Sequence, residues 1–159
     1  MTIDILFLSQ TDISCDPRIL RSIKYAVNGG YQTYSIGLTT NKKYILKEMS
    51  YQDKNISNFV SIIGRFNFLP KLVKNLIIPI EICLRISYLG IKKNPKIIHC
   101  NDVTPLPASL IIKFFTNSKL IYDAHELESK KNGINPIAGK IVYFFERLSW
   151  KKIDYFITV

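Results

Sequence analysis

Short apolar runs that end at polar residues alternate along this chain with longer stretches in which apolar residues recur at helical spacing. Such runs are typical of buried parallel strands, and the stretches between them have the length of crossover helices. The predicted strands are Ile3–Leu8, Tyr31–Leu38, Phe59–Ile63, Lys96–Cys100, Lys119–Asp123 and Asp154–Val159. This alternation predicts an α/β fold: a Rossmann-like, doubly wound, mostly parallel sheet with helices on both faces and strand order 3-2-1-4-5-6.

Helix boundaries follow from caps and prolines. Asp16 before Pro17 is an N-cap followed by proline at the first helical position, and Asn28–Gly30 ends that helix. A long helix begins at Pro70 and ends at Asn94-Pro95, with a kink expected at Pro79. Its apolar residues should cover one sheet face: Leu72, Val73, Leu76, Ile77, Ile80, Leu84 and Ile91.

Two further helices are predicted at Pro105–Phe115 and Pro136–Lys152. The polar stretch Thr39–Ser57 is predicted as a loop region that could hold a short strand around Tyr44–Met49, with Phe59–Ile63 the better candidate for the third strand.

Ionisable side chains follow two of the predicted strands. Ile97-Ile98-His99-Cys100-Asn101-Asp102 and Leu120-Ile121-Tyr122-Asp123-Ala124-His125-Glu126 each run from apolar to polar. Because a right-handed βαβ unit returns its second strand parallel to the first, both segments should reach the carboxyl edge of the sheet, where ligands bind. We therefore expect one crevice lined by His99, Asp102, Asp123, His125 and Glu126.

Composition narrows the possible partners. At 159 residues and 47% hydrophobic, the chain has room for one domain with a proper core. The net charge of +10 raises the question of nucleic acid, but the lysines are scattered and no arginine-rich run, zinc-finger spacing or RNP-like motif is present. An anionic membrane surface or a phosphorylated substrate fits better, unless the charge reflects only a general enrichment in Lys, Ile and Asn.

Compartment and membrane topology follow from local features. Cys15, Cys83 and Cys100 lack a CxxC spacing and the chain starts without a basic n-region, which predicts a cytosolic, reduced protein. Charges and a proline interrupt Leu72–Ile91, so this stretch should not cross a bilayer. The basic, apolar region Arg65–Lys96 either lies on anionic lipid or is an ordinary crossover helix.

Several motifs together resemble the N-terminal domain of retaining, GT-B-fold glycosyltransferases of family 4. The motifs are Ser14-Cys15-Asp16-Pro17-Arg18, Gly29-Gly30-Tyr31, His99-Cys100-Asn101-Asp102 with Pro105-Leu106-Pro107-Ala108, Tyr122-Asp123-Ala124-His125-Glu126, and Ile153-Asp154-Tyr155-Phe156-Ile157-Thr158-Val159. The resemblance spans nearly the whole of residues 1–159. It implies a domain that binds the acceptor, with a second domain binding the nucleotide sugar.

The resemblance also implies roles for individual residues. His125 would lie near the phosphate and anomeric carbon of the donor, where an imidazole favours developing charge. His99, Asn101 and Asp102 would approach the acceptor. Arg18 and the capped helix that Asp16 begins would face phosphate. Asp123 and Glu126 complete the expected substrate-binding set; the nucleotide sugar is a substrate, and no metal cofactor is expected.

Structural roles compete with these at several positions. His125 could cap a helix or bond within the core, Glu126 and Asp123 could favour a following helix N-terminus, and Asp102 could belong to an N-cap. His99 could point into the core. Cys100 is typical of a small buried hydrophobe, and a zinc site formed by His99, Cys100, His125 and Glu126 lacks any recognised ligand spacing.

The chain departs from the family in two respects. We expect the family's donor-binding domain to be absent from residues 1–159, which end inside a predicted strand, and the glycine-rich first loop is replaced by residues 10–15. The expectation is an acceptor-binding half that is inactive alone and acts on a glycan or lipid-linked acceptor. The alternative is a non-catalytic scaffold subunit that pairs with a separate donor-binding chain. A dinucleotide-binding oxidoreductase is disfavoured because no G-x-G-x-x-G follows the first strand.

Overall fold

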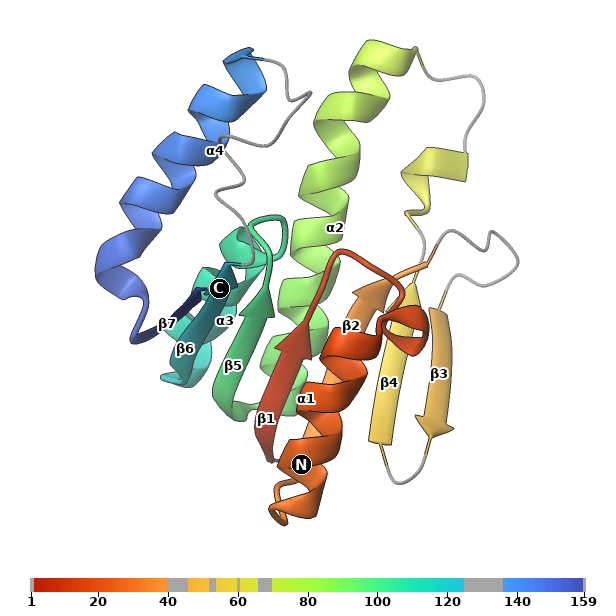
Figure 1. Cartoon of the computed structure of the whole chain (residues 1–159). Coiled ribbons are helices and arrows are strands. Elements are labelled where there is room, and N and C mark those ends of the chain that lie inside the picture. Colours follow the sequence, from red (N-terminus) through yellow and green to blue (C-terminus); the bar gives the residue numbers. More distant parts are fainter. Residues whose placement is uncertain are drawn as a thin grey trace.

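The computed structural model describes residues 2–39, 46–51, 54–59, 61–65, 70–124 and 136–158. Its strands are β1 (Ile3–Leu8), β2 (Thr33–Leu38), β3 (Leu46–Tyr51), β4 (Lys54–Phe59), β5 (Pro95–Asn101), β6 (Lys119–Ala124) and β7 (Tyr155–Thr158). Its main helices are α1 (Pro17–Asn28), α2 (Lys71–Lys93), α3 (Leu106–Thr116) and α4 (Pro136–Ser149), with short 3-10 turns η1 (Ile13–Cys15), η2 (Ile63–Arg65) and η4 (Trp150–Lys152). Figure 1 shows α1 on one face of the sheet and α2 with α3 on the other.

The sheet has the order β3-β4-β2-β1-β5-β6-β7. From β4 to β7 neighbouring strands are parallel, and β3 alone runs antiparallel beside β4 at the edge. The Rossmann-like α/β class, the helices on both faces and the parallel order 3-2-1-4-5-6 predicted from the sequence are therefore confirmed, with one extra edge strand. β2 and β4 lie on one side of β1, and β5, β6 and β7 lie on its other side, so the topological switch point lies between β1 and β5.

The short strand expected around Tyr44–Met49 is present as β3, but the stretch predicted as a loop also contains most of β4, which pairs with β3 in a hairpin. β3 and β4 fall largely inside Thr39–Ser57, and β4 begins five residues before the predicted strand Phe59–Ile63. β4 was not predicted because it contains two polar residues that are buried. Ser57 is hydrogen-bonded to the Tyr34 hydroxyl, and Asn58 bonds the loop that follows β1. Their partners lie far away in the chain, so a local reading of polarity could not anticipate burial.

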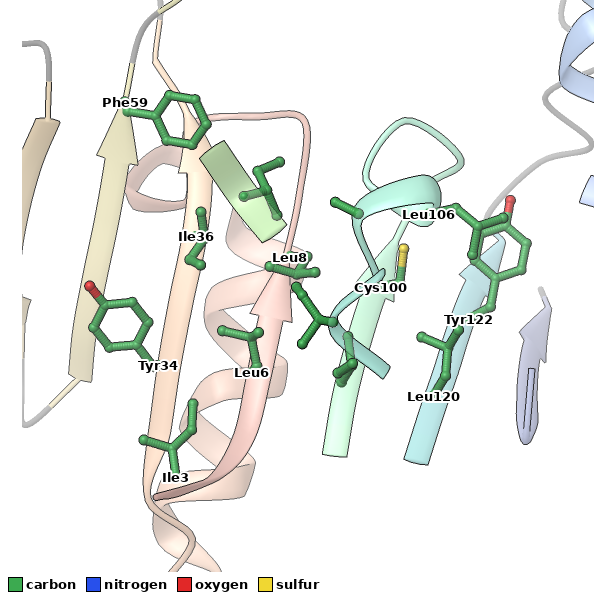
Figure 2. Packing of buried hydrophobic residues seen from close by; sticks show 14 residues of the cluster. Ile3, Leu6, Leu8, Tyr34, Ile36, Phe59, Cys100, Leu106, Leu120 and Tyr122 are labelled. Carbon is green, nitrogen blue, oxygen red and sulfur yellow. The ribbon is translucent and has the colours of Figure 1, made fainter. Parts of the chain in front are cut away.

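Two apolar clusters hold the layers together. On one face, Leu6, Leu8, Ile98 and Cys100 of the central strands pack against α2 and α3 (Figure 2). On the other face, a smaller cluster packs under α1 and consists of Phe7, Ile13, Ile19, Ile23 and Ile56. Alternation along β1 sends Leu6 and Leu8 to the first cluster and Phe7 to the second, as expected for a strand buried on both faces.

The prediction for the sheet-facing side of α2 was largely wrong. Leu72, Leu76, Ile80 and Leu84 are exposed, whereas Ile86, Ser87 and Gly90 are buried against the rest of the protein. Gly90 permits this contact because an added Cβ would overlap Ile112 of α3. Pro79 lies inside the helix. None of the helices in the described part of the chain is both long and apolar enough to span a bilayer.

Candidate functional site

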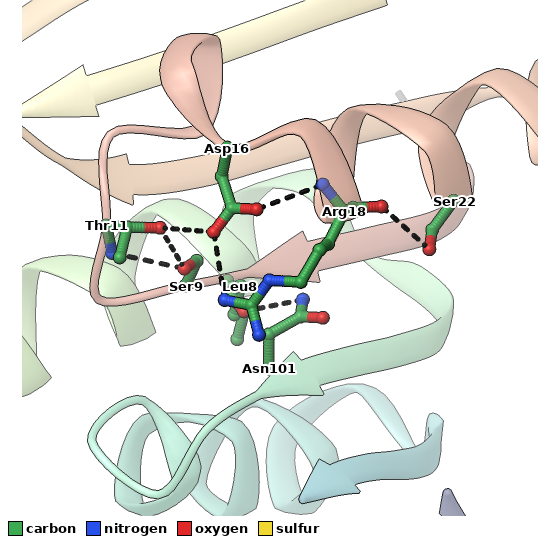
Figure 3. Close-up of polar contacts among 7 residues, drawn as sticks. All are labelled: Leu8, Ser9, Thr11, Asp16, Arg18, Ser22 and Asn101. Atoms are coloured by element: carbon green, nitrogen blue, oxygen red, sulfur yellow. Dashed lines mark hydrogen bonds and ion pairs between the residues drawn. The ribbon is translucent and has the colours of Figure 1, made fainter. Parts of the chain in front are cut away.

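The loop between β1 and α1 is organised by short polar contacts (Figure 3). Thr11 donates its backbone N–H to Ser9 Oγ at 3.1 Å and its hydroxyl to Asp16 Oδ2 at 3.2 Å. Asp16 Oδ1 accepts the backbone N–H of Arg18 at 3.1 Å, which is the N-cap bond of α1. The predicted cap is confirmed, and the cap residue also ties the loop to the helix.

Arg18 carries the positive charge of this region. Its Nη2 lies 3.2 Å from Asp16 Oδ2, and its side chain is 52% exposed, so the guanidinium remains accessible. The bond to Asp16 and the charges of Asp102 and Asp123 raise the pKa of Arg18. Partial burial works to raise the pKa of Asp16, but the bonds from Arg18 outweigh it and hold that pKa below its usual value. Figure 3 shows Arg18 extending from α1 toward Asn101 at the end of β5.

The ends of β5 and β6 bring the remaining polar residues to the same edge. Asn101 donates its Nδ2 to the Leu8 carbonyl at 3.0 Å and is paired in register with Asp123. Asp102 has a left-handed backbone, with φ of 70°, and donates its N–H to the Asp123 carbonyl at 3.2 Å. The turn after β5 is thus fixed to β1 on one side and to β6 on the other.

His99 lies on the same sheet face as α1. Its ring centroid is 5.1 Å from that of Phe7, and its Nε2 lies 3.5 Å from Asp123 Oδ2, with both side chains about nine-tenths buried. Its neighbour Cys100 points to the opposite face, where complete burial raises the pKa of the thiol to about 12. Cys100 is therefore a buried hydrophobe rather than a nucleophile.

The same alternation argues against a zinc site built on His99 and Cys100, because consecutive strand residues cannot bind one ion from opposite faces. Within the described ranges, no three His, Cys, Asp or Glu side chains are grouped in a way that could hold a metal. His125 and Glu126, the predicted catalytic residue and its neighbour, lie outside the described residues.

The structure thus brings Asp16, Arg18, His99, Asn101, Asp102 and Asp123 to the carboxyl edge at the β1–β5 switch point. Asp102 does not cap α3, because the N-cap position of that helix is Pro105. An open depression of about 370 Å³ lies beside this edge and is lined by Thr11, Asp12, Cys15, Asp16, Pro17 and Arg18. Its lining combines the Arg18 guanidinium with the carboxylates of Asp12 and Asp16, which together can donate to and accept from ligand hydroxyl groups.

Two residues that support the loop were not predicted from the sequence. Asn58 donates its Nδ2 to Asp12 Oδ1 at 2.6 Å and accepts the N–H of the fully buried Ile13 at 3.4 Å. Gly37 leaves room for this arrangement, since a Cβ there would lie 2.6 Å from the Thr11 carbonyl oxygen. Side chains of the loop itself and Asn58 of β4 anchor this glycine-free loop. An isolated glycine inside a predicted strand indicates a close backbone approach, so Gly37 offered a weak signal and Asn58 offered none.

No protein-family model and no curated protein matches this sequence. Two solved structures are similar in fold. The structure of sucrose-phosphate synthase from Thermosynechococcus elongatus superposes on 99% of this chain, and the match covers 47% of the synthase. The TM-score is 0.60 and the sequence identity is 10%. HepE of Anabaena, solved in complex with UDP and glucose, superposes on 91% of this chain, and the match covers 35% of HepE. The TM-score is 0.54 and the sequence identity is 14%.

This chain has one half of a GT-B fold. Both neighbours are GT-B glycosyltransferases, and the chain spans less than half the length of each. At these levels of identity the likeness establishes the arrangement of strands and helices. The chemistry has to be argued from the residues of the half-GT-B domain itself.

Proposed function

We propose that this domain is the acceptor-side half of a glycosyltransferase that transfers a glycosyl group from a nucleotide sugar to a hydroxyl of a glycan or lipid-linked acceptor. The main support is the cluster of Arg18, Asp102 and Asp123 at the switch point of a half-GT-B fold, because ligands of such sheets bind at that edge. In the reaction the acceptor oxygen bonds to the anomeric carbon as the bond to the nucleoside diphosphate breaks, and the acceptor's proton passes to the released diphosphate.

The contacts suggest a division of roles. An ionised carboxylate offers several lone pairs, so Asp102 can accept acceptor hydroxyls, while the buried Asp123 faces His99 behind it. His99 is a positioning residue, because its imidazole lies against Asp123 inside the protein. Arg18 donates to ligand oxygens, and Asp16 keeps it in place. Because carboxylates surround Arg18, a neutral, hydroxyl-rich acceptor suits the crevice better than a highly charged phosphate group.

The remaining roles rest on sequence. We propose His125 as the residue nearest the transferred sugar, Glu126 as a further substrate-binding residue, and a nucleotide-sugar substrate bound by a second domain or a partner chain, without a metal cofactor. Three free cysteines, of which Cys15 is exposed, favour a reducing compartment such as the cytoplasm. A scaffold subunit that pairs with a separate donor-binding chain would use the same fold without turnover.

Ligand-observed NMR on the full chain tests the acceptor assignment. Neutral mono- and disaccharides should show saturation transfer, and UDP-glucose should not. Asp102→Asn, which the left-handed backbone tolerates, should weaken saccharide binding about tenfold, the effect of one or two hydrogen bonds to a charged group. Asp4→Asn at the amino end of β1 is the matched control and should bind normally. Binding of UDP-glucose without any saccharide would contradict the proposal, as would binding of neither.

Turnover requires the donor side, so we expect none from the 159-residue chain alone. Joined to the part of HepE that it does not cover, the chain should release UDP from UDP-glucose when an acceptor is present. In that chimera His125→Ala should lower turnover by about 10²–10⁴-fold, the range for a positioned acid, base or charge-stabilising group. If Glu126→Ala caused that loss and His125→Ala did not, the role would pass to the carboxylate. Sugar binding without turnover would favour the scaffold subunit.

A further inference from the structure

The sheet face that α1 covers is open at its β7 end. His99 of β5, Ile121 of β6 and Tyr155 of β7 are partners in register, so their side chains lie on this one face. His99 is buried, Ile121 is half-buried and Tyr155 is 62% exposed. Ile157, two residues farther along β7, lies on the same face and is 42% exposed. Figure 1 shows the reason, because α1 lies over the central strands and away from β6 and β7.

β7 also lies at an edge of the sheet. Among the described strands it pairs with β6 alone, so its outer backbone groups are open to a further strand. Edge strands are usually protected from such pairing by charged residues, proline or a bulge. The strand at the opposite edge, β3, contains Lys47 and Glu48. β7 consists of two aromatic residues, an isoleucine and a threonine, which favour strand structure and carry no charge.

The other face of β7 is held by aromatic contacts. The Phe156 ring lies 5.9 Å from the Tyr122 ring and 4.5 Å from the Trp150 ring, measured between centroids. The Tyr122 hydroxyl in turn donates to Glu146 of α4 at 3.1 Å. These contacts fix the position of β7 beside β6, so that one edge and one face of an ordered strand remain open.

The charges around the amino end of β7 are mostly positive. Lys151 and Lys152 are exposed on η4, just before the strand, and Lys119 is 65% exposed at the start of β6. Asp154, the carboxylate nearest to β7 in the chain, is already bonded to Lys113 and Lys119. This end of the strand therefore favours a partner with acidic groups.

We propose that a separate, acidic polypeptide docks on β7. It adds a strand to the open edge, lays the apolar side of a helix over Tyr155 and Ile157, and places carboxylates beside Lys151 and Lys152. Strand addition of this kind takes its affinity from backbone hydrogen bonds and its specificity from side chains. A parallel strand fits best, because neighbouring strands from β4 to β7 are parallel and parallel sheets have helices on both faces.

A second copy of this chain would satisfy the open surface less well. Two β7 strands paired antiparallel about a two-fold axis would form one continuous sheet, in which the two open faces lie side by side and neither is covered. Each copy also carries a net charge of +10, which opposes association with itself. An acidic strand and helix would cover the face and complement the charge.

The docking surface borders the candidate site. Ile157 is paired in register with Asp123, whose Oδ2 lies 3.5 Å from His99 Nε2. A polypeptide that covers Ile157 would therefore lie beside the carboxyl edge of β6. Identifying this partner with the donor-binding chain rests on the proposed function. Docking itself is measured without sugar or nucleotide, so it can fail while saccharide binding succeeds, and the reverse.

Trp150, the only tryptophan of the chain, can report on docking because it lies against Phe156 of β7. The probe is a synthetic peptide of alternating threonine and valine with two glutamates at its amino end, which parallel pairing places beside Lys151 and Lys152. Added to the full chain, it should change Trp150 fluorescence in a saturable way and slow hydrogen exchange of the β7 amides. Peptides with the glutamates at the carboxyl end, or with lysines in their place, should bind at least about fivefold more weakly, the effect of one or two exposed ion pairs.

Variants of the chain test the surface itself. Tyr155→Glu removes an apolar cross-strand contact and adds repulsion, so it should weaken binding of the acidic peptide at least about tenfold. Lys151→Glu should weaken it about fivefold and should strengthen binding of the lysine peptide. The matched controls lie on α1, where Tyr25 is 70% exposed and Lys24 is also exposed. Tyr25→Glu and Lys24→Glu should leave binding unchanged.

Several outcomes would overturn the proposal, once circular dichroism and urea unfolding have established that each variant is folded. These are absence of saturable binding by the acidic peptide, equal binding of all three peptides, and equal losses in the α1 and β7 variants. A dimer that forms without peptide, seen by sedimentation equilibrium, and that Tyr155→Glu dissociates would assign the surface to a second copy instead.

Discussion

Gly37→Ala adds a single methyl group, and we expect it to displace the loop between β1 and α1 that forms part of the site. A Cβ at this position of β2 would lie 2.5 Å from Asn58 Oδ1, 2.6 Å from the Thr11 carbonyl oxygen and 2.8 Å from Ile13 Cγ1. To reach the 3.4 Å of ordinary contact, these atoms would have to retreat by roughly 0.6–0.9 Å. The Thr11 carbonyl is backbone and accepts the N–H of Leu38, so the loop must move as a unit.

The expected loss of stability follows from two contributions. Overpacking of a filled interior costs about 1–3 kcal/mol, and displacing Asn58 weakens its bonds to Ile13 and Asp12, a further loss of about 1 kcal/mol. We therefore expect the free energy of unfolding to fall by about 2–4 kcal/mol. For a urea m-value of about 2 kcal/mol/M this shifts the unfolding midpoint down by about 1–2 M. Because Thr11 bonds Asp16, the same displacement should weaken saccharide binding.

Gly64→Ala serves as the matched control. There an added Cβ would meet its nearest neighbour at 3.4 Å, an ordinary contact, and the expected change in unfolding free energy is within about 0.5 kcal/mol. Urea unfolding followed by circular dichroism measures both variants. If Gly37→Ala proved as mild as Gly64→Ala, the loop would not depend on the space above Gly37, and its anchoring through Asn58 would not require a glycine in β2.

Two further predictions concern acid stability. Burial alone would raise the pKa of Asp154, but Lys113, the Leu120 N–H and Lys119 lower it to about 2. A carboxyl group with a lowered pKa stabilises the fold fully above its unfolded pKa and loses that contribution as the pH falls through its folded pKa. Asp154→Asn should therefore lower the unfolding free energy by about 1–2 kcal/mol at pH 7, discounted for exposure, and by progressively less between pH 4 and pH 2. A loss of the same size at pH 7 and pH 2 would contradict this. The pKa of Glu81 is also lowered. Burial acts to raise this pKa, but the hydrogen bonds from Ser61 and from the Ile62 and Ile63 N–H groups outweigh burial. Glu81→Gln should lower the unfolding free energy by about 1–2 kcal/mol at pH 7 and by less toward pH 3. An unchanged urea unfolding midpoint at pH 7 would show that the residues around η2 do not need the charge of Glu81.

Local sequence signals determined most of the parallel core. Strong apolar runs placed β1, β5 and β6, and the Asp16-Pro17 pair placed the start of α1, because each signal is complete within a few residues. The polar residues after β5 and at the end of β6 were predicted to reach one edge, and the register of Asn101 with Asp123 brings them together. The rule that parallel strands share a carboxyl edge made this inference possible without any knowledge of contacts.

Tertiary contacts alone decided the rest. Ser57 and Asn58 could be buried in β4 only because Tyr34 and the β1–α1 loop supply their partners, so their polarity hid a strand. Apolar residues occur on several sides of α2, so its sequence alone does not show which side faces the sheet. Close contact at Gly90 places one side against α3, and Leu76 lies exposed on another side. Strand alternation turned His99 toward Asp123 and Cys100 away from it, a difference set by the register of β5 in the sheet rather than by the residues themselves.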